Sequence, residues 1–112
     1  MTVQIQLGDR RPSPLDPDPL GRTHLGWSEG MSETDIWKCS RGLWKFSADR
    51  VLSHTTVRFV TTTGLVVAVG AIQAVTRHGD RFAIEGRGVP GHAEVGKQTP
   101  TPHPSRNPIA YV

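Results

Sequence analysis

The chain has 112 residues, a net charge of +3 and a single cysteine. This length holds one domain with a small core. One cysteine excludes an internal disulfide and indicates a reducing, cytoplasmic setting. The longest apolar run is too short to span a bilayer and no secretory signal pattern is found, so we expect a soluble protein with no membrane partner.

Charge is distributed unevenly along the chain. Residues 1–35 carry a net charge of −3, whereas residues 36–112 carry +6. Ten of the thirteen cations are arginine, whose planar guanidinium suits bidentate contacts with phosphate or guanine. An excess of arginine over lysine also arises in chains from GC-rich genomes, so this excess has two explanations. A basic part behind an acidic leader points to a polyanionic partner.

Residues 1–34 are predicted to form an acidic, proline-rich leader that is largely irregular. Val3, Ile5 and Leu7 alternate with glutamines, which predicts a short half-buried strand or an added edge strand. Four prolines follow within residues 12–19 and exclude helix and sheet there. We therefore place the folded domain at residues 35–112.

In residues 36–50, aromatic rings alternate with lysines and arginines. Such a surface suits stacking on bases and pairing with phosphates, although the same spacing fits a strand whose rings face a core. We interpret residues 36–40 as a strand entering the fold, with Trp37 in a structural role. Residues 47–52 are predicted to form a helix capped by Ser47, with Asp49 in its first turn.

The remainder of the chain has the composition of short strands. We expect strands at residues 57–62, 65–75, 81–85, 93–98 and 107–112, with a hairpin turn at 77–80. Gly70 is predicted to mark a bulge or a close backbone approach. The expected fold is mostly β (α+β), a small barrel of about five strands with one short helix, since closure removes exposed sheet edges.

Four short motifs occur in order at residues 42–50 (GLWKFSADR), 79–86 (GDRFAIEG), 95–97 (VGK) and 107–111 (NPIAY). Together they resemble an accessory domain appended to bacterial GIY-YIG and other nucleases. That domain is similar to the PUA-like superfamily, which includes the EVE, YTH, SRA and ASCH domains. The resemblance implies a PUA-like barrel that binds nucleic acid, with an aromatic pocket for a modified base and no catalysis of its own.

These observations lead to one predicted site and one alternative. Trp44 and Phe46 would line a base pocket, with Trp37 as a further member in the alternative to its structural role. Phosphates would be contacted by Arg50, Arg58, Arg81 and Lys97. The Asn107 amide would either read a base edge or bond to main chain. The expected partners are DNA or RNA and a nuclease encoded nearby. Alternatively, the chain is a protein–protein interaction or oligomerisation module, and homo-oligomers stay open in both cases.

Catalytic and metal-binding patterns are missing from the sequence. The five histidines are dispersed and the single Cys39 forms no metal-ligand pair. Cys39 has no base nearby in the sequence that would activate it as a nucleophile. The glycines of residues 86–91 have dinucleotide-binding spacing, but Pro90 and the lack of a following helix argue against that motif. We therefore expect no enzyme activity, no metal and no cofactor.

Overall fold

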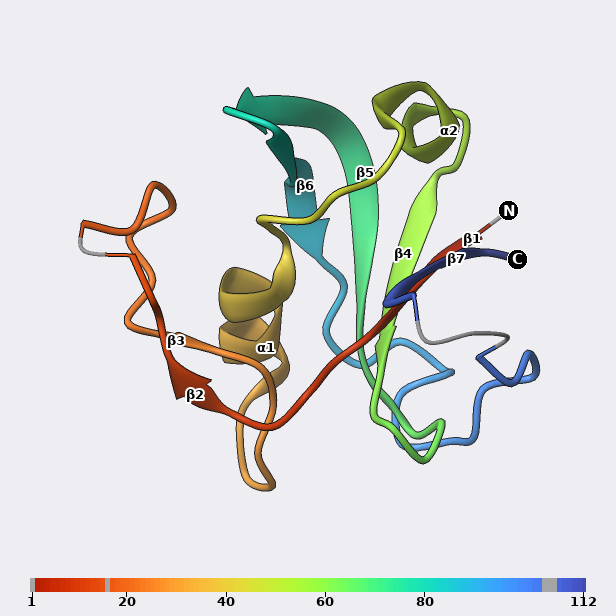
Figure 1. The fold of residues 1–112 in the computed structure, drawn as a ribbon. Helices are drawn as coiled ribbons and strands as arrows, with labels where there is room; N and C mark the ends of the chain where they lie inside the picture. The colour runs from red at the N-terminus through yellow and green to blue at the C-terminus, as the bar shows by residue number, and fades with distance from the viewer. Residues whose placement is uncertain (1, 16, 104–106) are drawn as a thin grey trace.

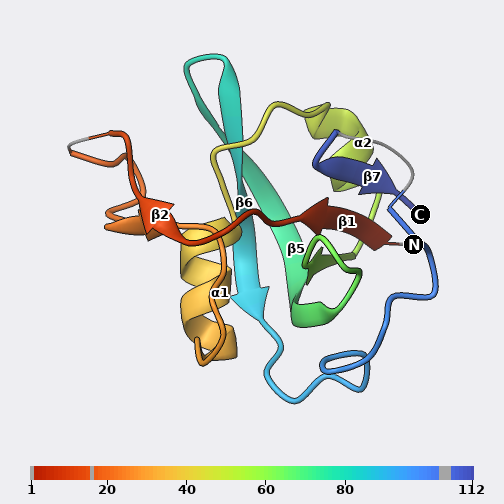
Figure 2. The ribbon, with the colours of Figure 1, turned by 60° about the horizontal axis from the view of Figure 1, so that its bottom comes forward.

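The computed structural model describes residues 2–15, 17–103 and 107–112. Its main sheet has five strands in the order β6-β5-β4-β1-β7 (Figure 1). These strands are β1 (Thr2–Gln6), β4 (Thr56–Val60), β5 (Val66–His78), β6 (Arg81–Gly88) and β7 (Ile109–Tyr111). β1 runs parallel to β4, and the other neighbouring pairs are antiparallel. A two-stranded hairpin, β2 (Arg11–Pro12) and β3 (His24–Leu25), stands at the side of the molecule away from the two termini (Figure 2).

The mostly β class is confirmed, but the predicted barrel is wrong because the sheet is open, with β6 and β7 at its edges. The chain covers part of the free edge of β6 in another way. Trp44 and Phe82 exchange two backbone hydrogen bonds of 2.9 Å, and the Ile84 amide donates to the Arg41 carbonyl at 2.7 Å. Because these backbone hydrogen bonds already occupy part of the edge of β6, the sheet does not need to close into a barrel to protect that edge.

The structure has two helices where one was expected, α1 (Glu33–Ser40) and α2 (Ala48–Leu52). The strand predicted for residues 36–40 is wrong. Ser32 caps α1 by accepting a hydrogen bond from the Asp35 amide at 3.1 Å, and the first turn is acidic. The predicted cap of α2 is confirmed, since the Ser47 hydroxyl accepts from the Arg50 amide at 3.3 Å. Neither helix has the length and apolar content needed to cross a bilayer.

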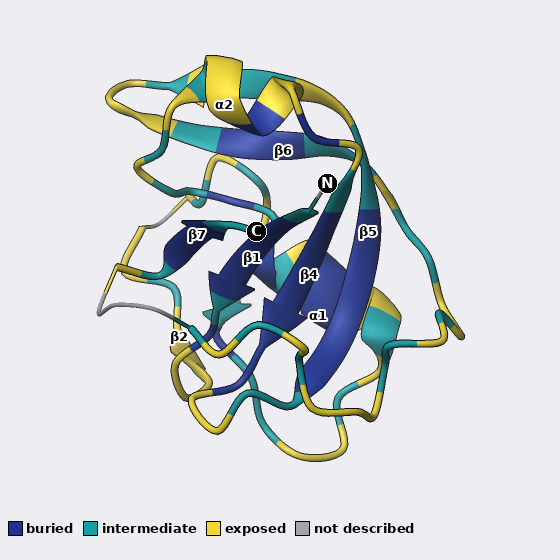
Figure 3. Ribbon diagram, turned by 90° about the vertical axis from the view of Figure 1, so that its right-hand side faces the viewer, coloured by how far each residue is buried: buried dark blue, intermediate teal, exposed yellow. Residues whose placement is uncertain are grey.

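Both faces of the sheet are buried along β1, β4 and the first five residues of β5, where consecutive residues are buried (Figure 3). Val3, Ile5 and Phe59 are fully buried in the core that the sheet forms with α1 and α2. On the opposite face, Gln4 and Arg58 lie beneath the loop that follows β6. β1 was expected as part of a leader, yet it lies between β4 and β7, so the sheet uses residues on both sides of the boundary placed at residue 34.

The predictions for the second half of the chain are mostly confirmed. Strands form at the four ranges that became β4, β5, β6 and β7, although β4 begins one residue earlier and β5 and β6 each end three residues later than predicted. Gly79 turns the hairpin with φ of 67°. The strand expected at residues 93–98 is wrong. Gly91 and Gly96 adopt φ of 75° and 86° and turn the chain there, while Gln98 pairs with Leu65 in an isolated bridge.

Gly70 is a point of close approach, and it yields the first testable prediction. A Cβ at this position would lie 2.3 Å from Cζ3 of Trp37, whose ring packs edge-on against Phe59. Because the indole is held in the core, Gly70→Ala should lower the free energy of unfolding by about 1–3 kcal/mol, as measured by urea denaturation. Gly88→Ala is the matched control, since its Cβ would make only ordinary contact with Trp37 at 3.5 Å. Equal losses in the two variants would contradict the prediction.

Candidate nucleic-acid interface

The segment between the two helices is fixed across the start of β6. Trp44 pairs with Phe82 through the backbone, and its indole Nε1 donates to the Ser40 carbonyl at 2.7 Å. Phe46 stacks on Phe82 with ring centroids 5.5 Å apart and an interplanar angle of 18°. Two members of the predicted base pocket, Trp44 and Phe46, are therefore both held against Phe82.

A cleft of about 350 Å³ opens beside Trp44. One wall is formed by residues 43–44 and the other by the loop of residues 8–26, which carries β2 and β3. The lining is mostly apolar, and Leu15 remains 47 % exposed there. The volume of the cleft lies in the range of small-ligand sites. Apolar lining residues include Leu7, Leu15, Leu25, Leu43 and Trp44.

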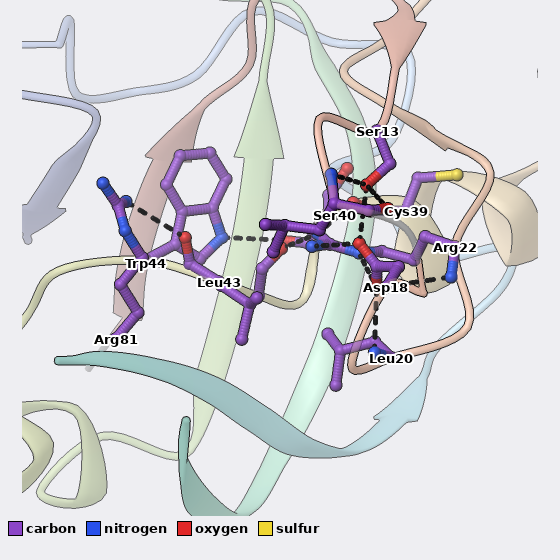
Figure 4. A network of polar contacts seen from close by, with 11 residues as sticks. Ser13, Asp18, Leu20, Arg22, Cys39, Ser40, Leu43, Trp44 and Arg81 are labelled. Atoms are coloured by element: carbon purple, nitrogen blue, oxygen red, sulfur yellow. Dashed lines mark hydrogen bonds and ion pairs between the residues drawn. The ribbon is translucent and has the colours of Figure 1, made fainter. Parts of the chain in front are cut away.

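Two exposed arginines line this cleft, Arg11 from the hairpin loop and Arg81 from β6. Arg81 donates to the Leu43 carbonyl at 3.4 Å, and Arg11 donates to the Asp9 carbonyl at 3.3 Å. No salt bridge joins either guanidinium to a carboxylate among the described residues. Figure 4 shows Arg81 beside Trp44. The cleft thus combines a flat ring, apolar walls and two guanidinium groups that can pair with an anion.

A third arginine, Arg22, lines the cleft but is committed to a buried ion pair. Its guanidinium makes two hydrogen bonds of 3.1 Å to the two carboxylate oxygens of Asp18, and the side chains are 6 % and 1 % exposed. Nη1 of Arg22 also donates to the Cys39 carbonyl at 3.2 Å and to the Gly42 carbonyl. We call this arrangement the Asp18–Arg22 clamp (Figure 4). It ties the hairpin loop to the C-terminal end of α1, where a cation is favoured.

The electrostatics of Asp18 follow from the clamp. Burial alone would raise the pKa of this carboxyl, because it penalises the charged form. Hydrogen bonds from Arg22, from the Ser13 hydroxyl at 2.8 Å and from the Leu20 amide at 2.8 Å outweigh burial. They hold the pKa of Asp18 well below its usual range, so the clamp is ionised at neutral pH.

Cys39 is half-buried in the wall of the cleft. Burial is the largest cause that raises the pKa of its thiol, and Asp35 adds to the rise, while Arg10 and Arg22 act against it. The thiol is therefore protonated at neutral pH and contributes a small apolar surface instead of a nucleophile.

Two of the predicted site residues have structural positions. Trp37 is 8 % exposed and packs in the core edge-on against Phe59. Arg58 is 4 % exposed; its Nε donates to Gln4 at 2.8 Å and its Nη1 lies 3.1 Å from Glu94. Both side chains therefore have structural partners in the folded protein, and the expected base contact of Trp37 and phosphate contact of Arg58 stay predictions.

The remaining predicted residues lie away from the cleft lining. Arg50 is exposed and places its guanidinium over the Tyr111 ring, 3.8 Å from the centroid. The side-chain amide oxygen Oδ1 of Asn107 accepts from the Ile109 backbone amide at 3.0 Å, which is the bond to main chain that was weighed for this residue. Lys97 is exposed in the loop that covers the opposite face of the sheet. Of the eight predicted residues, the cleft lining includes only Trp44 and Arg81, with Phe46 nearby on Phe82.

Sequence reasoning missed the contribution of residues 8–26. Arg11, Leu15 and Arg22 line the cleft although they belong to the segment expected as an irregular leader. One signal was available, namely the Asp18–Arg22 spacing of four residues in a proline-rich stretch that otherwise has no reason to be ordered. No protein-family model, curated protein or solved structure matches the chain, so the PUA-like resemblance stays a prediction.

Proposed function

We propose that the protein is a nucleic-acid-binding module that acts through the cleft beside Trp44 and has no catalytic activity of its own. The observation that carries this proposal is the pair of exposed guanidiniums, Arg11 and Arg81, on an apolar cleft walled by an indole. An indole and apolar side chains suit a flat base, while guanidinium groups suit the phosphates attached to it. The charge of +6 carried by residues 36–112 adds long-range attraction for a polyanion.

Salt dependence provides the direct test. We expect fluorescently labelled DNA and RNA oligonucleotides to bind, with an affinity that falls steeply between about 50 and about 200 mM salt. Arg81→Ala and Arg11→Ala should each weaken binding by roughly fivefold, as for a contact of about 1 kcal/mol, and should flatten the log–log salt slope by about 0.7–0.9. The measurement is fluorescence anisotropy over a salt series.

Arg87→Ala is the matched control, because Arg87 is exposed on the same strand β6 as Arg81 and does not line the cleft. It should leave affinity and slope close to those of the unchanged protein. Quenching of tryptophan fluorescence on binding, lost in Trp44→Phe, would support base contact at the cleft. The proposal fails if no nucleic acid binds with a salt-dependent affinity, or if the Arg11 and Arg81 variants bind as well as the Arg87 variant.

A further inference from the structure

A second and larger hollow, of about 660 Å³, adjoins the cleft. The two share Arg22 and Cys39, so these residues lie at the boundary between the hollows, which we call the ridge. The second hollow is open and its lining is more polar. Its charged lining residues are Arg10, Arg22, Asp35, Lys38, Arg41 and Glu85.

The charges of the second hollow leave two cations available. Arg22 is held by Asp18, and Arg41 lies 3.0 Å from Glu85. Arg10 and Lys38 are exposed, and neither forms a salt bridge with another described residue. Asp35, also exposed, is the carboxylate that opposes them. The unpaired side chains of this hollow therefore have a net positive charge.

The backbone explains why both hollows are basic. Arg10 and Arg11 are consecutive residues in an extended stretch, and neighbouring side chains of an extended chain point to opposite sides. Arg11 accordingly lines the cleft, and Arg10 lines the second hollow. The same segment thus supplies one guanidinium to each side of the ridge.

We infer that the ligand is a single-stranded oligonucleotide that spans both hollows, with a base in the cleft against Trp44 and neighbouring phosphates on Arg10 and Lys38. This inference rests on the proposed function and deepens it. A mononucleotide in the cleft would leave the cations of the second hollow without a partner. In a duplex the bases are stacked and paired, so a base would enter the cleft only after costly extrusion.

Ligand length is the variable that tests this inference. Competition anisotropy should show an affinity that increases from a mononucleotide through a dinucleotide to longer single strands, and a weaker affinity for a duplex of the same sequence. Arg10→Ala and Lys38→Ala should each weaken binding of the longer strands by roughly fivefold and flatten their salt slope by about 0.7, while leaving mononucleotide binding unchanged. Arg81→Ala should weaken the binding of every ligand.

Asp35→Asn is a control for which the opposite change in affinity is expected. Removal of the carboxylate that opposes Arg10 and Lys38 should strengthen the binding of the longer strands alone. The side chains of Arg10, Lys38 and Asp35 are exposed, so the urea midpoints of these three variants should stay close to that of the unchanged protein. The inference is overturned if long single strands bind no more tightly than a mononucleotide, or if a duplex binds as tightly as the single strand of the same sequence. It is also overturned if Arg10→Ala and Lys38→Ala leave oligonucleotide binding unchanged while Arg81→Ala still weakens it. That last pattern would leave the proposed function intact, whereas absence of any salt-dependent binding would overturn the function itself.

Discussion

Asp18→Asn should lower the free energy of unfolding by about 3–5 kcal/mol, the cost of breaking a buried ion pair by removing one partner. Asparagine has nearly the volume of aspartate, so packing is preserved and the loss comes from charge. The Arg22 guanidinium would remain 94 % buried, with carbonyl groups but no carboxylate to balance it. Urea denaturation measures the loss, and faster proteolysis within residues 9–27 would locate it in the hairpin loop.

A double-mutant cycle separates the ion pair from other effects. Asp18→Asn combined with Arg22→Met should cost clearly less than the sum of the two single substitutions, because the second change removes the uncompensated charge. Glu29→Gln is the matched single control, since Glu29 is an exposed carboxylate of the same segment, and it should change stability by less than about 0.5 kcal/mol. A loss for Asp18→Asn as small as that of the control would contradict the clamp.

The pH dependence of stability tests the same carboxylate without mutation. The pKa of Asp18 is lower in the folded protein than in the unfolded chain, so the unfolded chain binds the proton first as pH falls. The contribution of Asp18 is therefore fully present above about pH 4, near the unfolded pKa, and is lost progressively below it. Asp18→Asn should show a flatter fall in urea midpoint over that acidic range than the unchanged protein.

How much of the fold could be predicted depends on whether local pattern and tertiary packing agree. β-branched residues at 57–60 and the turn at Gly79 signal strands and a hairpin locally, and the structure confirms both. A strand was predicted wrongly for residues 36–40, because Ile36 and Trp37 have strand propensity. The helix that forms there depends on the Ser32 cap and on the packing of Trp37 over Gly70. The barrel was inferred from a general need to protect edges, and no local pattern shows that residues 41–44 cover β6.

The candidate site also combines residues that the local sequence indicates with residues that only tertiary packing brings into place. Trp44 and Arg81 stand out by type and position, and both line the cleft. Arg11 and Arg10 could not be assigned, because their positions depend on a loop that is held in place by Asp18 and Arg22 across the end of α1. A contact between residues far apart in sequence leaves no periodic pattern. The burial of Arg58 was equally hard to predict, since a basic residue on a strand is expected to face solvent unless a distant segment covers that face of the sheet.

Arg58→Ala should lower the free energy of unfolding by about 3 kcal/mol. This variant tests whether Arg58 stabilises the fold, in contrast to the arginines proposed to bind nucleic acid. Arg58 is 4 % exposed, and its Nε donates to the buried amide oxygen of Gln4. Truncation leaves Gln4 short of a partner and Glu94 without its cation, and it removes the apolar stem that fills the space over β4. The loss lies at the low end of the range for buried pairs because Glu94 is 37 % exposed and can be partly rehydrated.

Stability and oligonucleotide binding should separate the two kinds of arginine, because each substitution is expected to change only one of these two measurements. Arg58→Ala should lower the urea midpoint and leave the salt slope of oligonucleotide binding unchanged at temperatures where the variant is folded. Arg81→Ala should do the reverse, and Arg87→Ala, at an exposed position on the same strand β6 as Arg81, should change neither. A flatter salt slope for Arg58→Ala with unchanged stability would mean that the loop over the opposite face opens and that Arg58 reaches phosphate. The charge that binds nucleic acid would then lie on the other side of the sheet from Trp44.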